Sequence, residues 1–149
     1  ATHGVSYGAE GRVRASFVAL TADATHDGFL TVGDILDELP ALSAELVVLS
    51  ACETGLGQVA QSEGVVGLAR ALLVKGVRSV LVSLWSVDDA ATEALMTRFY
   101  AHWLSPASAA RPSKAEALRR AQADLRADPH HPEWRDPRYW AAFQLVGAP

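Results

Sequence analysis

The sequence has little of what marks several large classes of protein. Cys52 is its only cysteine, which excludes an internal disulfide framework and leaves too few thiolates for a structural zinc site. Its 13 basic side chains against 17 acidic ones form no basic stripe, so the electrostatic footprint of a nucleic-acid or anionic-membrane binder is missing. No apolar run approaches the roughly 18 residues of a membrane-spanning helix. We therefore expect a soluble, cytoplasmic protein that binds neither nucleic acid nor membrane.

The chain does contain enough apolar residues for a core. Half of its 149 residues are apolar and 20% are charged, which is typical of one globular domain. Short, β-branched strands are predicted at 46–49 and 77–82, and the segment between them has helical apolar spacing at 65–73 and a capping glycine, Gly76. This alternation predicts an α/β domain with three layers, a mostly parallel sheet and helices on both faces.

Turn and capping residues delimit the other predicted elements. Three further helices are expected, each with a polar residue at its start: Thr31, Ser86 (with Asp89 three residues on) and Ser113. Further strands are expected at 16–20 and 141–146, and a turn is expected at Asp27-Gly28. Residues 105–112, rich in Ala, Ser and Pro, are predicted to form a flexible loop.

Cys52 stands where functional groups gather in an open α/β sheet. It follows the predicted strand 46–49 through Ser50 and Ala51, and a polar, glycine-containing loop comes next. Loops and helix N-termini converge at the carboxyl ends of parallel strands, and nearby backbone N–H groups favour the thiolate form of a cysteine. The alternative interpretation is that Cys52 is a small, inert, buried residue. Its position alone does not decide between the two.

His3 and Cys52 belong to two motifs that together resemble a known family. His3 precedes Cys52 by about 50 residues, as the histidine precedes the cysteine in caspases. Ala1-Thr2-His3-Gly4 and Leu49-Ser50-Ala51-Cys52-Glu53-Thr54-Gly55 resemble the paired signature of CHAT domains, which are caspase-like cysteine peptidase domains usually found beside tetratricopeptide repeats in bacterial proteins. The resemblance spans residues 1–149 and continues in three segments: 63–71, 83–89 and 139–147.

The resemblance implies a caspase/separase-type fold, a His–Cys dyad and limited proteolysis, without a metal or cofactor. In such a dyad His3 acts as general base toward Cys52 and later protonates the leaving amine. The backbone N–H groups of Gly4 and Cys52 are the expected oxyanion donors, and glycine suits this role because it has no Cβ to obstruct the substrate.

Four residues are candidates for substrate binding. Ser50 matches a position that lines the pocket for the residue preceding the cleaved bond in caspase-like folds. Asp88 and Asp89 correspond roughly to acids that help recognise arginine in the separase branch, although both also suit a helix N-terminus. Glu53 is the other nearby acid, and its place in the signature could equally reflect loop structure.

We expect a cysteine endopeptidase that cleaves a protein or peptide substrate and is joined to tetratricopeptide repeats in a larger protein. Two alternatives stay open: a regulated or non-catalytic interaction module with this fold, and a thiol hydrolase of small acyl substrates. A caspase-like sheet has strands before its histidine, and His3 is almost the first residue. We therefore expect a single CHAT domain that lacks its N-terminal strands here, and poor activity from the isolated segment.

Overall fold

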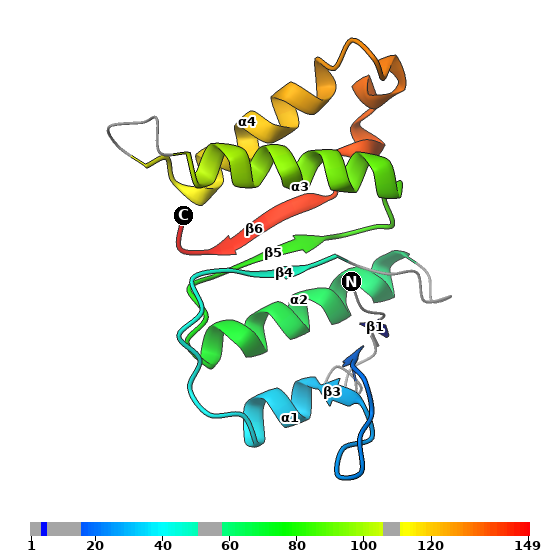
Figure 1. Cartoon of the computed structure of the whole chain (residues 1–149). Helices are drawn as coiled ribbons and strands as arrows, with labels where there is room; N and C mark the ends of the chain where they lie inside the picture. Colours follow the sequence, from blue (N-terminus) through cyan, green and yellow to red (C-terminus); the bar gives the residue numbers. More distant parts are fainter. Residues whose placement is uncertain (1–3, 6–15, 51–57, 106–110) are drawn as a thin grey trace. The chain divides into compact units, whose positions relative to one another are not determined.

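The computed structural model describes residues 4–5, 16–50, 58–105 and 111–149 (Figure 1). The chain divides into two compact units, one comprising residues 1–86 with 146–148 and the other residues 87–145 with 149. Helices and strands occur together, which confirms the mixed α/β class. Each helix in the described ranges is too short or too polar to cross a membrane.

A three-stranded antiparallel sheet begins the first unit. Its strands lie in the order β1 (Gly4–Val5), β2 (Phe17–Ala19) and β3 (Phe29–Thr31). The strand predicted at 16–20 is confirmed as β2. The predicted turn is also confirmed, because Gly28 has a φ of +85° and a Cβ there would lie 2.8 Å from the carbonyl oxygen of Leu20. β1 and β3 are absent from the prediction, since so few residues show no alternation.

Helix α1 (Val32–Asp37) begins at the predicted capping residue, Thr31. Thr31 Oγ1 accepts a hydrogen bond of 3.0 Å from the Asp34 backbone N–H, and the Asp34 carboxylate accepts one of 2.8 Å from the Thr31 N–H. This reciprocal arrangement satisfies two donors at the helix start. The hydrogen bonds from the Thr31 backbone and side chain lower the pKa of Asp34. Val32 and Ile35 bury the inner face of the helix.

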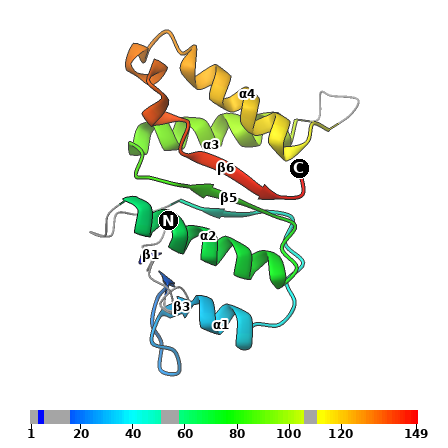
Figure 2. The same ribbon diagram turned by 180° about the vertical axis from the view of Figure 1, so that it is seen from behind.

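The predicted strand, helix and strand are confirmed as β4 (Val47–Leu49), α2 (Gln58–Val74) and β5 (Ser79–Ser83). The two strands are parallel, and Leu49 pairs with Val82. In both views α2 lies between α1 and this pair of strands (Figures 1 and 2). Gly76 ends α2 at a φ of +103°, its N–H donating to Leu73 O while the Val77 N–H donates to Leu72 O. These are the two hydrogen bonds of a Schellman motif.

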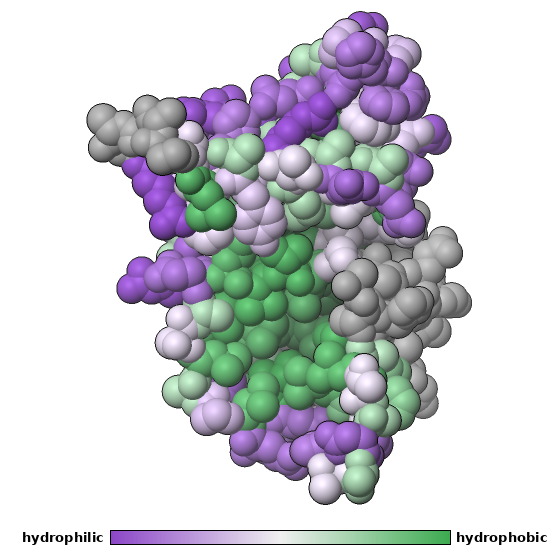
Figure 3. Space-filling view, viewed as in Figure 1, coloured by the Kyte–Doolittle hydropathy of each residue, from purple (hydrophilic) through white to green (hydrophobic). Residues whose placement is uncertain are grey.

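The core of the first unit is formed where α2 meets β5 and α1. Val80 and Val82 of β5 pack in one cluster with buried apolar residues of α2 and with Ile35 of α1. All of β5 is buried, whereas every residue of β4 is half-buried. Figure 3 shows apolar residues gathered on one face of this unit. β4 is therefore the less protected of the two parallel strands.

The last strand, β6 (Phe143–Gly147), completes a sheet of order β4-β5-β6. The sequence predicts this strand at 141–146, so its existence is confirmed with a shift of a few residues. Two hydrogen bonds join Ala148 to the start of β5 and to the residue before it: Ser79 Oγ donates to Ala148 O at 2.6 Å, and the Ala148 N–H donates to Arg78 O at 2.9 Å.

The second unit consists mainly of two packed helices, α3 (Asp89–Trp103) and α4 (Lys114–Arg126). His102 Nε2 lies 2.6 Å from Asp124 Oδ2 and joins the two helices, and Arg98 forms an ion pair with Asp128 just beyond α4. Two short 3₁₀ helices follow, η2 (Pro132–Arg135) and η3 (Pro137–Tyr139).

One predicted helix start is confirmed and another is wrong. Ser113 caps α4, its Oγ accepting from the Glu116 N–H at 3.2 Å. Ser86 does not cap α3; the cap is Asp88, whose carboxylate is adjacent to the first turn and bonds the Ala91 N–H. The three-layer arrangement, the single domain and the missing strands stay predictions. Residues 106–110, most of the expected loop, lie outside the described residues.

Candidate functional site

The carboxyl ends of β4 and β5 lie at one edge of the parallel pair. Leu49 and Val82 are partners in the register, so the residues that follow them leave the sheet at the same edge. Ser50 is exposed and comes directly after β4. The next residues include Cys52 and Glu53, which lie outside the described residues, as does His3. The structure therefore describes the approach to the proposed nucleophile rather than its side chain.

Gly4 follows His3 and is the first residue of β1. Its backbone pairs with Val18 of β2, so the small antiparallel sheet holds the chain immediately after the histidine. β1 and β4 both belong to the first unit. The predicted base and nucleophile are thus each next to a strand of the same compact unit.

Asp88 and Asp89 belong to the second unit, and Asp88 has a structural role there. Asp88 Oδ1 accepts a hydrogen bond of 3.0 Å from the Ala91 N–H, and the Asp88 carbonyl accepts from Thr92. Asp89 is exposed in the first turn of α3, where a negative charge complements the helix dipole. The helix-start alternative is therefore sufficient for Asp88, and Asp89 is not paired with Ser86 in a capping box.

Two further residues stand at the edge that bears Ser50, although the sequence suggests no chemistry for them. Ser83 ends β5 with 2% of its surface exposed, and its Oγ donates to the Trp85 carbonyl at 3.2 Å. This bond shapes the turn that brings the half-buried Trp85 just past the strand. Both residues lie in the segment 83–89 that carries the family resemblance, which is the signal that could have singled them out.

The other noteworthy polar residues form turns. Asp23 accepts hydrogen bonds from the Thr25 backbone, the Thr25 hydroxyl and His26, and these bonds lower the pKa of Asp23 to about 2. They form a polar turn at His26. Within the described ranges, no group of three or more His, Cys, Asp or Glu side chains is placed to hold a metal ion.

The chain as a whole matches a family of caspase-like, peptidase-related domains. The model of the CHAT domain family matches residues 1–148, and the chain belongs to that family. Similar curated proteins include tetratricopeptide repeat protein 28 of Mus musculus, 38% identical over 119 residues, and the protein of the same name of Homo sapiens, 36% identical over 120 residues. Each match covers 80% of this chain, and the chain spans 4% of the length of these relatives.

Proposed function

We propose that the chain carries the catalytic centre of a cysteine endopeptidase that performs limited proteolysis through His3 and Cys52. The observation that carries this proposal is the position of Ser50 at the edge where β4 and β5 both end, two residues before Cys52 in the sequence. Membership of a caspase-like family supports it. In α/β sheets this edge is where loops and helix N-termini form binding crevices.

The two side chains divide the reaction between them. His3 accepts the thiol proton, and Cys52 Sγ attacks the carbonyl carbon of the scissile peptide bond. The C–N bond then breaks as His3 returns the proton to the leaving amine, and water hydrolyses the thioester. The N–H groups of Gly4 and Cys52 stabilise the oxyanion, and Ser50 lines the pocket for the residue before the cleaved bond. Glu53, Asp88 and Asp89 are proposed as further substrate contacts.

We also propose that the complete domain extends the parallel sheet beyond β4, with helices on both faces. Among the described residues β4 pairs with β5 alone, and its Val-Val-Leu sequence is only half-buried. Parallel strands of such composition are normally covered on both faces and paired within a sheet. A strand preceding His3 in the longer protein would supply that pairing.

The relatives suggest the setting in which the domain works. Both are named as tetratricopeptide repeat proteins. We propose that such repeats accompany this domain in the full-length protein and present a protein substrate to it. A single cysteine suits a reducing compartment, the cytoplasm, since no disulfide is needed there.

A thiol-reactive peptide probe tests the dyad, with peptide mapping to assign the label to Cys52, the only cysteine of this chain. With the full-length protein we expect His3→Gln to slow labelling and peptide cleavage by at least roughly 100-fold, the usual contribution of a general base. His26→Gln is the matched control, since His26 lies in an exposed turn, and it should leave both rates unchanged. Cys52→Ala should abolish cleavage while circular dichroism shows an intact fold.

The same experiment separates the alternatives. Cleavage retained by Cys52→Ala would remove the nucleophile assignment. Absence of labelling in folded protein would favour the interaction module. Turnover of small thioesters without cleavage of any peptide would favour an acyl hydrolase.

A further inference from the structure

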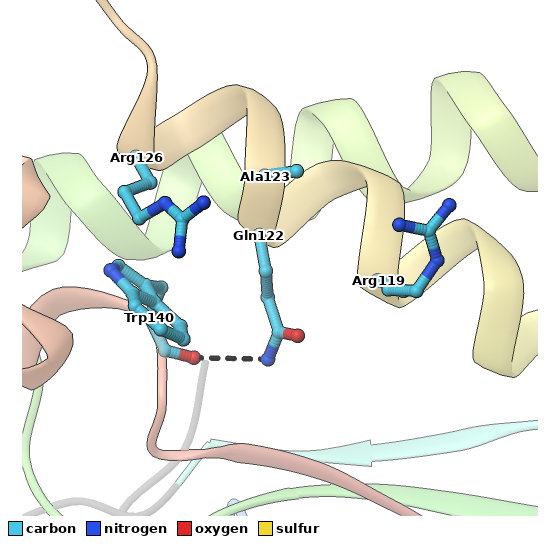
Figure 4. A pocket seen from close by; sticks show the side chains of 5 residues that line it. All are labelled: Arg119, Gln122, Ala123, Arg126 and Trp140. Carbon is cyan, nitrogen blue, oxygen red and sulfur yellow. Dashed lines mark hydrogen bonds between the residues drawn. The ribbon is translucent and has the colours of Figure 1, made fainter.

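The second unit contains a small pocket between α4 and the chain that follows η3 (Figure 4). Its volume is about 220 Å³, and its lining consists of Arg119, Gln122, Ala123, Arg126 and Trp140. Sites for drug-sized ligands usually measure roughly 300–1,000 Å³. This pocket is smaller, so its size suits a single side chain or a small ion.

The walls of the pocket are fixed by the fold. On α4, Gln122 comes three residues after Arg119, and Arg126 comes four residues after Gln122. This spacing places all three on one face of the helix. Gln122 Nε2 donates to the carbonyl oxygens of Trp140 at 3.1 Å and Phe143 at 3.2 Å. Figure 4 shows the Trp140 ring opposite this helical face. The indole is therefore held against α4 by the backbone that carries it.

The charge of the pocket is concentrated at one end. Arg119 Nε and Nη2 bind Glu116 at 2.7 and 2.8 Å, and Arg120 binds the same carboxylate at 2.7 Å. These hydrogen bonds lower the pKa of Glu116 to about 2, so the carboxylate stays ionised and offsets the charge of Arg119. Arg126 has no carboxylate partner among the described residues, and its guanidinium carbon lies 5.9 Å from the centre of the Trp140 ring. Arg126 thus presents a cation without a carboxylate partner beside an aromatic face.

We propose that this pocket binds the acidic side chain of an extended segment of a protein partner, with Arg126 as its principal contact. A glutamate fits this arrangement because its methylene groups can pack on the indole while its carboxylate meets the planar guanidinium with two hydrogen bonds. No acid lines the pocket to repel it. The site goes beyond the proposed peptidase activity, since all five residues belong to the second unit, whereas Gly4 and Ser50 belong to the first.

A purely structural role for Arg126 makes a different prediction. The residue stands in the last turn of α4, where a cation stabilises the helix dipole, and it packs near Trp140. If that were its only role, replacing Arg126 would change the melting temperature but leave the affinity for an acidic peptide unchanged. Binding must therefore be measured directly, with stability recorded alongside.

The test uses the full chain with Cys52→Ala, which prevents cleavage of the probe. The NMR signal of the Trp140 indole N–H is followed as three probes are added. They are a capped Gly-Gly-Glu-Gly-Gly peptide, the same peptide with Gln in place of Glu, and free glutarate. We expect the Glu peptide to bind at least roughly tenfold more tightly than the Gln peptide, as a charged hydrogen bond requires. Arg126→Gln should abolish this preference and Arg126→Lys should reduce it.

Arg120→Gln is the matched control, because Arg120 is an exposed arginine of α4 that does not line the pocket. It should keep the preference. Equal binding of the Glu and Gln peptides, or equal losses in the Arg120 and Arg126 variants, would overturn the proposal. Glutarate binding as tightly as the Glu peptide would show a site for small anions and would also overturn it. None of these readouts depends on His3 or on peptidase activity.

Discussion

At the residue scale, the Asp88 carboxylate fits two roles: capping α3 and contacting a basic side chain of the substrate. Its Oδ1 caps α3 through the Ala91 N–H, and the residue is nonetheless exposed. The charge of an exposed cap is available to a substrate, whereas the capping hydrogen bond needs only an oxygen acceptor. Substitutions that remove the charge but keep the acceptor oxygen can therefore distinguish helix capping from recognition of a basic substrate side chain.

We expect Asp88→Ala to lower the free energy of unfolding by about 1 kcal/mol, because the Ala91 N–H loses its acceptor. Asp88→Asn keeps an acceptor oxygen and should change that free energy little. Chemical denaturation of both variants checks the pair. A fall in the kcat/KM of Asp88→Asn for substrates with arginine before the cleaved bond, at unchanged stability, would assign substrate recognition to the charge.

Capping residues were predictable where the local chemistry left one choice. Thr31 and Ser113 each precede a helix with an acid three residues on, and both cap as expected. Ser86 has the same spacing to Asp89, yet Asp88 competes with it and is placed directly before the helix. For the dyad, the sequence motifs alone carry the prediction of His3 and Cys52, because both residues lie outside the described residues.

At the scale of elements, α2 has an unusual position because it is covered on more than one side. It lies between α1 and the parallel strands, and it contacts α1 and β5. Its end must be sharply defined, since the chain has to turn from Val74 into β5 within a few residues. Gly76 makes this turn possible through its left-handed conformation.

Gly76→Ala should destabilise the first unit by roughly 2 kcal/mol, the order of cost for a non-glycine residue held in a disfavoured conformation. An added Cβ would lie 2.6 Å from the carbonyl oxygen of Leu42, so the backbone would also have to shift. Thermal denaturation measures the effect. Val74→Ala, at the exposed last residue of the same helix, is the control and should cost little. Equal melting temperatures for Gly76→Ala and the unsubstituted chain would contradict the expectation.

The elements that sequence could predict are those with a long or strongly apolar pattern. β5 is buried throughout and has the apolar run Val80-Leu81-Val82 at its centre, and the spacing of Val65, Leu68 and Leu72 marks α2. β1 and β3 have no comparable pattern, because pairing with β2, rather than their own composition, makes them strands.

At the scale of the whole molecule, β4 is an edge strand of its sheet among the described residues. Its backbone pairs with β5 on one side, whereas β5 has a neighbour on each side. Backbone N–H groups in a parallel strand alternate between its two edges. Those of β4 that point away from β5 have no strand partner among the described residues.

Hydrogen exchange measures this difference. In the 149-residue chain we expect residues 46–50 to exchange faster than β5, and in the full-length protein we expect them to become protected by an additional strand. The amides of β5 serve as the internal control, because they should be protected equally in both proteins. Equal exchange of β4 in the short and full-length proteins would argue against a sheet that continues past this edge.

The register of β4 on β5 also sets a length scale for the chemistry. Neighbouring residues along a strand are about 3.3 Å apart, so a slip of one residue would carry Ser50 by that distance and turn alternate side chains to the opposite face. A general base acts on its nucleophile across about 2.6–3.2 Å. The pairing of Leu49 with Val82 therefore sets the position of Ser50 along the sheet edge. The interior packing of Val82, which holds that register, fixes the point from which the chain starts toward Cys52.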